Sequence, residues 1–184
     1  MSIINAGLEE YRNAFFALNE KLVAKQLVME VKAIGGYAML YNHLREGGFT
    51  VDVDTATKDY SPEIKELIFD VSVEKGLEED WLNNDAYSLP EVMEVLDELE
   101  WEEDKSFSNI TLLIATKPSL LKLKMRAIHF GGLVPRITDK IDFLDLLKSL
   151  DIHSIDEVKN CEYTKDMEKD YQRCFEFLRE KVKW

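Results

Sequence analysis

The chain contains little of what disulfide-rich, zinc-binding or membrane-spanning proteins require. Only two cysteines and three histidines occur among 184 residues, and they are scattered, with no Cys-x-x-Cys pair. This pattern indicates neither a disulfide framework nor a zinc site. No apolar run approaches the roughly 20 residues that cross a bilayer, and the first residues lack the basic start and apolar stretch of a signal peptide. We therefore expect a globular cytoplasmic protein without a membrane partner.

Charge is distributed unevenly along the chain. Residues 62–104 contain sixteen acidic side chains against Lys65 and Lys75, whereas residues 117–136 contain five basic residues and no acid. Because nucleic-acid affinity depends on neutralising phosphates with Lys and Arg, the acidic stretch argues against broad duplex DNA binding. That stretch is either a pair of solvated helices over 62–75 and 89–98 or a docking face for a basic partner. The basic stretch is a candidate region for facing an anion.

A glycine pair separates a predicted strand from a predicted helix. Residues 28–34 have the pattern of a strand, Gly35 and Gly36 interrupt it, and apolar residues at helical spacing follow over 37–45. Glycines at such a turn let the backbone approach a ligand closely, and amides that begin a helix favour phosphate oxygens. Gly35 and Gly36 are therefore candidate nucleotide-binding residues, although a glycine pair alone usually marks only a turn.

Two aspartates follow in a segment, residues 50–55, that reads as a strand. Alternate side chains of a strand point to the same side, so Asp52 and Asp54 are expected to lie together while Val51 and Val53 face the core. Mg²⁺ prefers oxygen ligands and is usually held by one or two carboxylates together with substrate phosphates. Asp52 and Asp54 are therefore the predicted catalytic and metal-binding residues, with Mg²⁺ or Mn²⁺ as cofactor.

Lys124 is out of place in the helix predicted over 119–128. Projection at about 100° per residue puts Lys124 near the middle of an apolar arc and puts Lys122 and Arg126 on the opposite face. A buried ammonium is normally paired, so we expect Lys124 to meet either a carboxylate in an ordinary salt bridge or a nucleotide phosphate.

Arg136, Asp139 and Asp142 follow a Gly-Gly turn at 131–132 and accompany an amphipathic helix predicted over 141–150. Thr138 or Asp139 is suited to capping that helix, and aspartate is among the preferred N-cap residues. Asp142 falls on its polar side, where we expect it to be solvated.

Several short motifs occur in order over residues 28–150: Ile34-Gly35-Gly36, Thr50-x-Asp52-Val53-Asp54, Gly76-Leu77, Asp80 to Ala86, Leu120-Leu121-x-x-Lys124-Met125-x-Ala127 and Arg136-x-x-Asp139-x-x-Asp142. In this combination the chain resembles bacterial nucleotidyltransferase-like proteins of unknown function that are related to the AbiEii-type abortive-infection toxins. The resemblance implies a polymerase-β-like nucleotidyltransferase fold, with a nucleoside triphosphate and magnesium as ligands. It also implies nucleotide-binding roles for Lys124, Arg136, Asp139 and Asp142, and a cognate antitoxin as partner if the protein is a toxin of this type.

The chain departs from the family's pattern in three places. Fifteen residues separate Gly36 from Asp52, which is long for the usual motif, and we expect Gly47 and Gly48 to absorb the excess as a loop. Relatives often carry a basic residue four positions before the first aspartate, where this chain has Gly48, and the nearest basic residue is Arg45. Active members of the wider fold commonly place a third carboxylate on a later strand. The strand predicted over 107–115 contains no acid, and the acids at 102–104 read as an exposed run. The site is therefore suited to catalysis with two carboxylates or to nucleotide binding without turnover.

The fold class predicted from these patterns is α+β. A small mixed sheet from residues 28–34, 50–55 and 107–115 is flanked by helices in a nucleotidyltransferase-like core over 1–116, and a helical portion over 117–184 packs on it. Further helices are predicted over 8–23 and 166–183. Residues 81–86 are expected to be an irregular structural segment, with Trp81 buried and the asparagines making turn hydrogen bonds.

The leading functional hypothesis is a metal-dependent nucleotidyltransferase that moves a nucleoside monophosphate from a triphosphate to an RNA or protein acceptor, with a toxin–antitoxin role as an extension. The first alternative is a catalytically impaired nucleotide-binding or regulatory module of a toxin–antitoxin pair. A metal-dependent nuclease, which uses similar carboxylates, is the third class left open by the sequence.

Overall fold

The structure is a computed structural model that describes residues 6–45, 48–130, 136–165, 172–174, 176 and 179. It divides into two compact units, which are described separately: residues 1–89 with 101–115, and residues 90–100 with 116–184. Residues 90–100 thus belong to the second unit although they precede a strand of the first. Both units together give an α+β protein, as predicted. No helix within the described ranges is both long and apolar enough to span a membrane.

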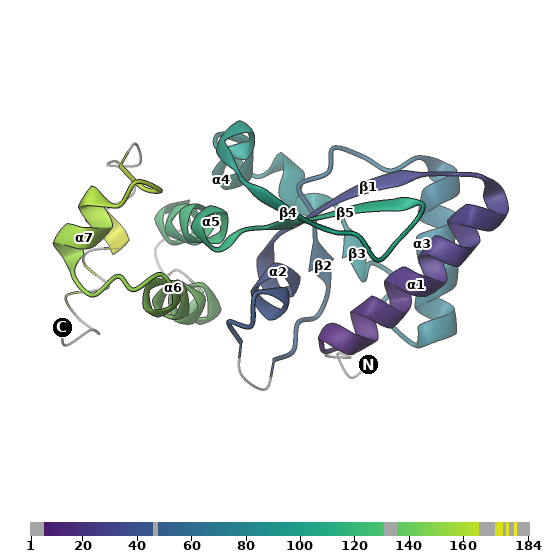
Figure 1. The fold of residues 1–184 in the computed structure, drawn as a ribbon, viewed down its shortest axis with the longest axis horizontal. Coiled ribbons are helices and arrows are strands. Elements are labelled where there is room, and N and C mark those ends of the chain that lie inside the picture. Colours follow the sequence, from purple (N-terminus) through teal and green to yellow (C-terminus); the bar gives the residue numbers. More distant parts are fainter. Residues whose placement is uncertain are drawn as a thin grey trace. The chain divides into compact units, whose positions relative to one another are not determined.

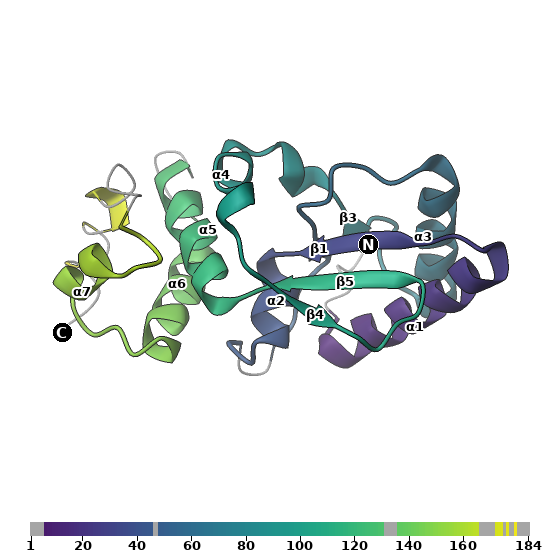
Figure 2. The same cartoon turned by 45° about the horizontal axis from the view of Figure 1, so that its top comes forward.

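A three-stranded mixed sheet forms the centre of the first unit (Figures 1 and 2). Its middle strand is β5 (Ile110–Ala115), which pairs in parallel with β1 (Met29–Ala33) and antiparallel with β4 (Trp101–Asp104). The predicted strands over 28–34 and 107–115 are therefore confirmed. The acidic run at 102–104 was expected to be exposed, and Glu102 and Glu103 are exposed in β4. Asp104 is instead buried, where Arg12 and Ser106 supply its partners.

Two very short strands form a second sheet, which an isolated bridge connects to the end of β1. β2 (Val53–Asp54) pairs in parallel with β3 (Leu82–Asn83), and Thr55 makes an antiparallel bridge to Ala33. The strand predicted over 50–55 is thus only two residues long. Val51, which we expected in the core, is 43% exposed, because regular pairing begins at Val53 and residues 51–52 form a bend.

Among the described residues of the first unit, the α-helices are α1 (Leu8–Lys25), α2 (Gly35–Tyr41) and α3 (Pro62–Lys75), with α1 against α3 (Figure 1). A 3₁₀ helix spans Asp85–Ser88. α3 has the predicted bounds, because the Ser61 side chain accepts a hydrogen bond from Ile64 N–H and Gly76 ends the helix in a left-handed conformation. α2 is shorter than the predicted 37–45. The core contains an aromatic cluster: Tyr11, Phe15, Tyr37 and Trp81.

The second unit is helical. α5 (Lys117–Phe130) packs against α6 (Ile137–Ser149) and against the short α4 (Pro90–Met93), and α7 (Ile155–Asn160) follows. The helices predicted over 119–128 and 141–150 are confirmed, and both begin earlier than predicted. Asp139 therefore does not cap α6, because the helix starts at Ile137 and Asp139 lies in its first turn. The Gly-Gly turn at 131–132 and most of the helix predicted over 166–183 lie outside the described residues.

The helix predicted over 89–98 is wrong. The chain forms α4 and then a separate 3₁₀ turn over Leu96–Glu98. Glu94 lies three or four residues from Glu91, Asp97 and Glu98, and like charges at that spacing disfavour a continuous helix. Two of these acids instead pair with cations of α5.

Candidate functional site

The glycine turn touches the aspartate strand in the first unit. Gly35 has a φ angle of +61°, and a β-carbon at this position would lie 2.6 Å from Oδ2 of Asp54. A β-carbon at Gly36 would lie 2.1 Å from Oγ1 of Thr50 and 2.9 Å from a guanidinium nitrogen of Arg45. A side chain at Gly35 would therefore be strained by the positive φ angle and would displace the Asp54 carboxylate, and a side chain at Gly36 would crowd Thr50. The sequence predicted a glycine turn ahead of a helix over 37–45, whereas Gly35 and Gly36 are the first two residues of α2, and Gly35 lies directly against Asp54.

Asp52 and Asp54 flank a fully buried Val53. Both aspartate side chains are half-buried, and Asp52 stands in the bend before β2 while Asp54 belongs to the strand. Burial raises the pKa of the Tyr11 hydroxyl, and the negative charges of Asp52 and Asp54 raise it further. Both carboxylates therefore lie within electrostatic reach of the same phenol, and their pairing at one site stays a prediction.

The start of the first unit fixes the chain two residues before Asp52. Thr50 N–H donates to Ala6 O over 3.1 Å, and the Thr50 carbonyl accepts from Ala6 N–H at 3.0 Å and from the Tyr11 hydroxyl at 3.2 Å. On the other side, Ile34 N–H donates to the Asp54 carbonyl over 2.9 Å. The aspartate segment is thus held from both ends by backbone contacts.

Asn83 is a site residue that the sequence analysis missed. It pairs with Asp54 in the β2–β3 ladder, and its side-chain nitrogen donates to Oδ2 of Asp52 over 3.0 Å. The turn hydrogen bond expected of this segment is present, since Asp85 N–H donates to Oδ1 of Asn83 at 3.2 Å. A strand of two residues has no periodicity, so nothing in the local sequence signals that Asn83 reaches Asp52.

The donor chemistry of the aspartate pair suits magnesium or manganese. The part of the chain that the structure describes contains no group of three or more His, Cys, Asp or Glu side chains placed to hold a metal ion. Two carboxylates are nevertheless a sufficient protein contribution for Mg²⁺, which completes its coordination with water and substrate phosphates. Asp52 and Asp54 would be the ligands, and the Gly35 backbone lies directly against the Asp54 carboxylate.

The other predicted site residues come together in the second unit. Nζ of Lys124 lies 2.8 Å from Oδ1 of Asp139 and 2.7 Å from Oδ2 of Asp142, and all three side chains are buried. Arg136 Nε donates to Oδ2 of Asp139 at 2.9 Å. Lys124 therefore meets an opposite charge, as expected, and two carboxylates supply that charge. Asp142 was expected to be solvated but is buried, because it faces Lys124. The nucleotide-binding role of these four residues stays a prediction.

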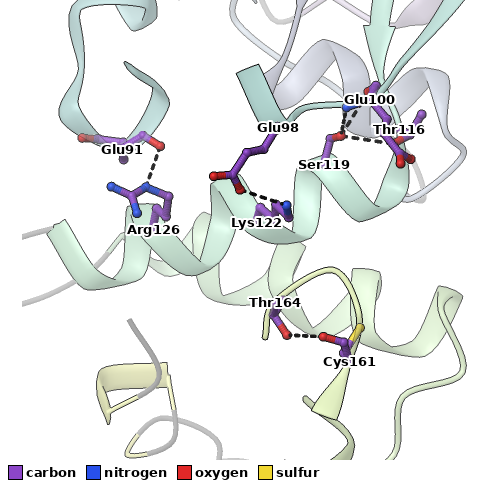
Figure 3. A network of polar contacts seen from close by, with 9 residues as sticks. All are labelled: Glu91, Glu98, Glu100, Thr116, Ser119, Lys122, Arg126, Cys161 and Thr164. Carbon is purple, nitrogen blue, oxygen red and sulfur yellow. Dashed lines mark hydrogen bonds and ion pairs between the residues drawn. The ribbon is translucent and has the colours of Figure 1, made fainter. Parts of the chain in front are cut away.

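Two cations of the basic stretch over 117–136, Lys122 and Arg126, contact acidic residues of the segment 90–100 (Figure 3). Arg126, expected on the face opposite the apolar arc, is only 2% exposed, and its Nε donates to the Glu91 carbonyl over 2.9 Å. Its guanidinium also contacts the Glu94 carboxylate. Lys122 Nζ lies 3.2 Å from the Glu98 carboxylate. Much of the positive charge of this stretch is thus offset within the second unit.

Comparison of the chain with protein-family models, with curated proteins and with solved structures gives no match. The functional argument therefore rests on the residues of the chain and on the geometry of the aspartate pair and glycine turn.

Proposed function

We propose that the protein is a metal-dependent nucleotidyltransferase whose site is formed by the Gly35–Gly36 turn, Asp52 and Asp54. The observation that carries this proposal is the approach of the Gly35 backbone to the Asp54 carboxylate, so close that a β-carbon would lie 2.6 Å from Oδ2. A glycine turn, of the kind that lets a backbone approach a phosphate, is thereby packed against Asp54, one of two carboxylates that suit a divalent cation. The motif resemblance over residues 28–150 supports the same assignment.

In this reaction a hydroxyl group of an RNA or protein acceptor attacks the α-phosphorus of a nucleoside triphosphate. A bond forms between the acceptor oxygen and the α-phosphorus, and the bond from that phosphorus to the oxygen bridging to the β-phosphate breaks. Pyrophosphate leaves with the electron pair, and the acceptor proton passes to solvent. Asp52 and Asp54 would hold Mg²⁺ or Mn²⁺, which supplies charge stabilisation for the attacking and leaving oxygens.

The neutral Asn83 favours a second candidate function. It occupies the register position opposite Asp54, where it adds no negative charge, and within the described ranges no third acid joins the aspartate pair. A site with two carboxylates is also compatible with a module that binds nucleotide and metal without turnover. Such a module would act as a regulatory component of a toxin–antitoxin pair.

The experiment that separates these functions uses each of the four nucleoside triphosphates, labelled at the α-phosphate, with Mg²⁺ or Mn²⁺ and total RNA. Label incorporated into RNA or protein supports transfer. Nucleotide retained on the protein without incorporation supports the binding module. Shortened RNA without incorporation would instead indicate a nuclease.

A matched pair of double variants tests the location of the site. The Asp52→Asn/Asp54→Asn variant is expected to lose metal-dependent nucleotide retention and any transfer. The Glu66→Gln/Asp70→Asn variant removes the same charge from the exposed face of α3 and is expected to behave like the wild type. If the first variant retains nucleotide in a metal-dependent manner as well as the second does, the site has been assigned to the wrong residues.

A further inference from the structure

Asn83 is held in a fixed orientation beside Asp52. Its carbonyl accepts from Thr55 N–H at 3.0 Å and from the Thr55 hydroxyl at 2.9 Å. Its side-chain oxygen is engaged by Asp85 N–H at 3.2 Å, which leaves the NH₂ group as the end that meets the Asp52 carboxylate. Backbone and side chain are therefore both restrained, and the amide presents a donor to Asp52.

The segment that carries Asn83 is anchored in the core. Trp81 is fully buried, and its indole nitrogen donates to the Ile68 carbonyl over 3.0 Å. The Trp81 carbonyl accepts from Val53 N–H at 2.7 Å, so the tryptophan aligns β3 with the aspartate strand. Asn83 is two residues further along this aligned chain, which places it opposite Asp54.

We propose that Asn83 is a positioning residue that holds Asp52 beside Asp54 and, being uncharged, makes divalent-metal binding depend on the phosphates of the nucleotide. This inference rests on the proposed function and deepens it. Mg²⁺ gives up its water reluctantly, so two carboxylates bind it weakly until phosphate oxygens add their charge. A carboxylate at position 83 would supply that charge from the protein and remove the dependence on nucleotide.

The test measures free Mn²⁺ by electron paramagnetic resonance during titration of the protein, with Mn²⁺ alone and with each of the four nucleoside triphosphates. The wild type is expected to bind Mn²⁺ at least about tenfold more tightly with the nucleotide that it retains than without it. Asn83→Asp is expected to bind Mn²⁺ alone about tenfold more tightly than the wild type. Asn83→Ala is expected to lose about tenfold in nucleotide-dependent Mn²⁺ affinity, the lower end of the range for residues that orient metal ligands.

The neighbouring asparagine provides the control. Asn84 donates to the Lys58 carbonyl over 3.0 Å, so Asn84→Asp adds the same charge one residue away from the contact with Asp52. Circular dichroism of each variant reports whether it is folded. If Asn83→Asp binds Mn²⁺ no more tightly than Asn84→Asp, or if the wild type binds Mn²⁺ equally well without nucleotide, the inference is wrong. Should Asn83→Asp fail to fold, unchanged Mn²⁺–nucleotide affinity in Asn83→Ala overturns it.

The two proposals fail in different ways. A wild type that retains no nucleoside triphosphate contradicts nucleotidyl transfer. If Asn83→Asp nevertheless gains Mn²⁺ affinity, and adding Asp52→Asn abolishes that gain, the position of Asn83 at a metal site is supported while its dependence on nucleotide is overturned.

Discussion

Replacement of Lys124 by methionine should strongly destabilise the second unit. The Lys124 side chain is 9% exposed, and the Asp139 and Asp142 side chains that contact it are 4% and 3% exposed. Methionine keeps most of the volume and removes the ammonium, so two buried carboxylates lose that partner. Arg136 still contacts Asp139, but its side chain is 79% exposed, and surface ion pairs contribute little.

The expected loss is a large part of the stability of a domain. Removing one partner of a buried ion pair costs about 3–5 kcal/mol. Folded domains are stable by about 5–15 kcal/mol in total. With a urea dependence of about 2 kcal/mol per molar, the unfolding transition of the second unit should shift to lower urea by roughly 2 M. Urea unfolding followed by far-ultraviolet circular dichroism measures this shift.

Lys122→Met is the matched control on the same helix. Lys122 contacts Glu98 at 3.2 Å, and the Glu98 side chain is 52% exposed, so the loss should stay below about 1 kcal/mol. A triple variant, Lys124→Met with Asp139→Asn and Asp142→Asn, removes the unbalanced charge and should recover part of the stability lost in Lys124→Met. The charge argument is refuted if Lys124→Met is no less stable than Lys122→Met, or if the triple variant recovers nothing. A Lys124→Met protein of normal stability that no longer retains nucleotide would instead assign the ammonium to a phosphate.

Three further predictions concern the first unit. Gly35→Ala should lower the free energy of unfolding by about 1–2 kcal/mol because of the positive φ angle, as measured by urea unfolding. It should also weaken Mn²⁺ binding, measured by titration, because the new β-carbon would clash with Asp54. Tyr37→Phe should leave the free energy of unfolding unchanged or raise it by up to about 1–3 kcal/mol, since the described residues supply no hydrogen-bond partner for this buried hydroxyl. A clear fall in the free energy of unfolding, measured in urea, would contradict this prediction. Burial raises the pKa of Tyr11 and of Tyr37 above the ordinary value of 10.0, so each protonated tyrosine contributes fully to the free energy of unfolding below pH 10. Above pH 10 the free energy of unfolding should fall by about 1.4 kcal/mol per pH unit for each tyrosine. Urea unfolding and phenolate absorbance measure this.

The elements that the sequence predicted well carry their own start and stop signals. α3 has a serine cap, a proline at its first position and a glycine after its last, and its bounds match the prediction. β1 and β5 are mostly apolar strands, and both were predicted. β4 and β3 were not, because an acidic strand and a two-residue strand acquire their conformation from their partners in the sheet.

The candidate site was predictable to the same extent. The glycine turn and the aspartate pair are local motifs, and the structure brings Gly35 against Asp54. Asn83 lies 31 residues from Asp52, and its contact depends on the burial of Trp81 and on strand pairing. Such a contact has no local pattern, so a sequence can suggest that residues 81–86 are structural without indicating which carboxylate they orient.

The contrast between Lys124 and Arg126 explains why the charge asymmetry of the sequence was only partly understood. Both are buried cations of α5, yet the helical projection predicted burial only for Lys124, because it assumes that a helix has a single apolar face. α5 has a second covered side: it packs against α4 as well as against α6. On that second side Arg126 contacts the Glu91 carbonyl and the Glu94 carboxylate. An acidic stretch and a basic stretch that each look like binding surfaces for external partners are therefore, in part, partners of one another within the second unit.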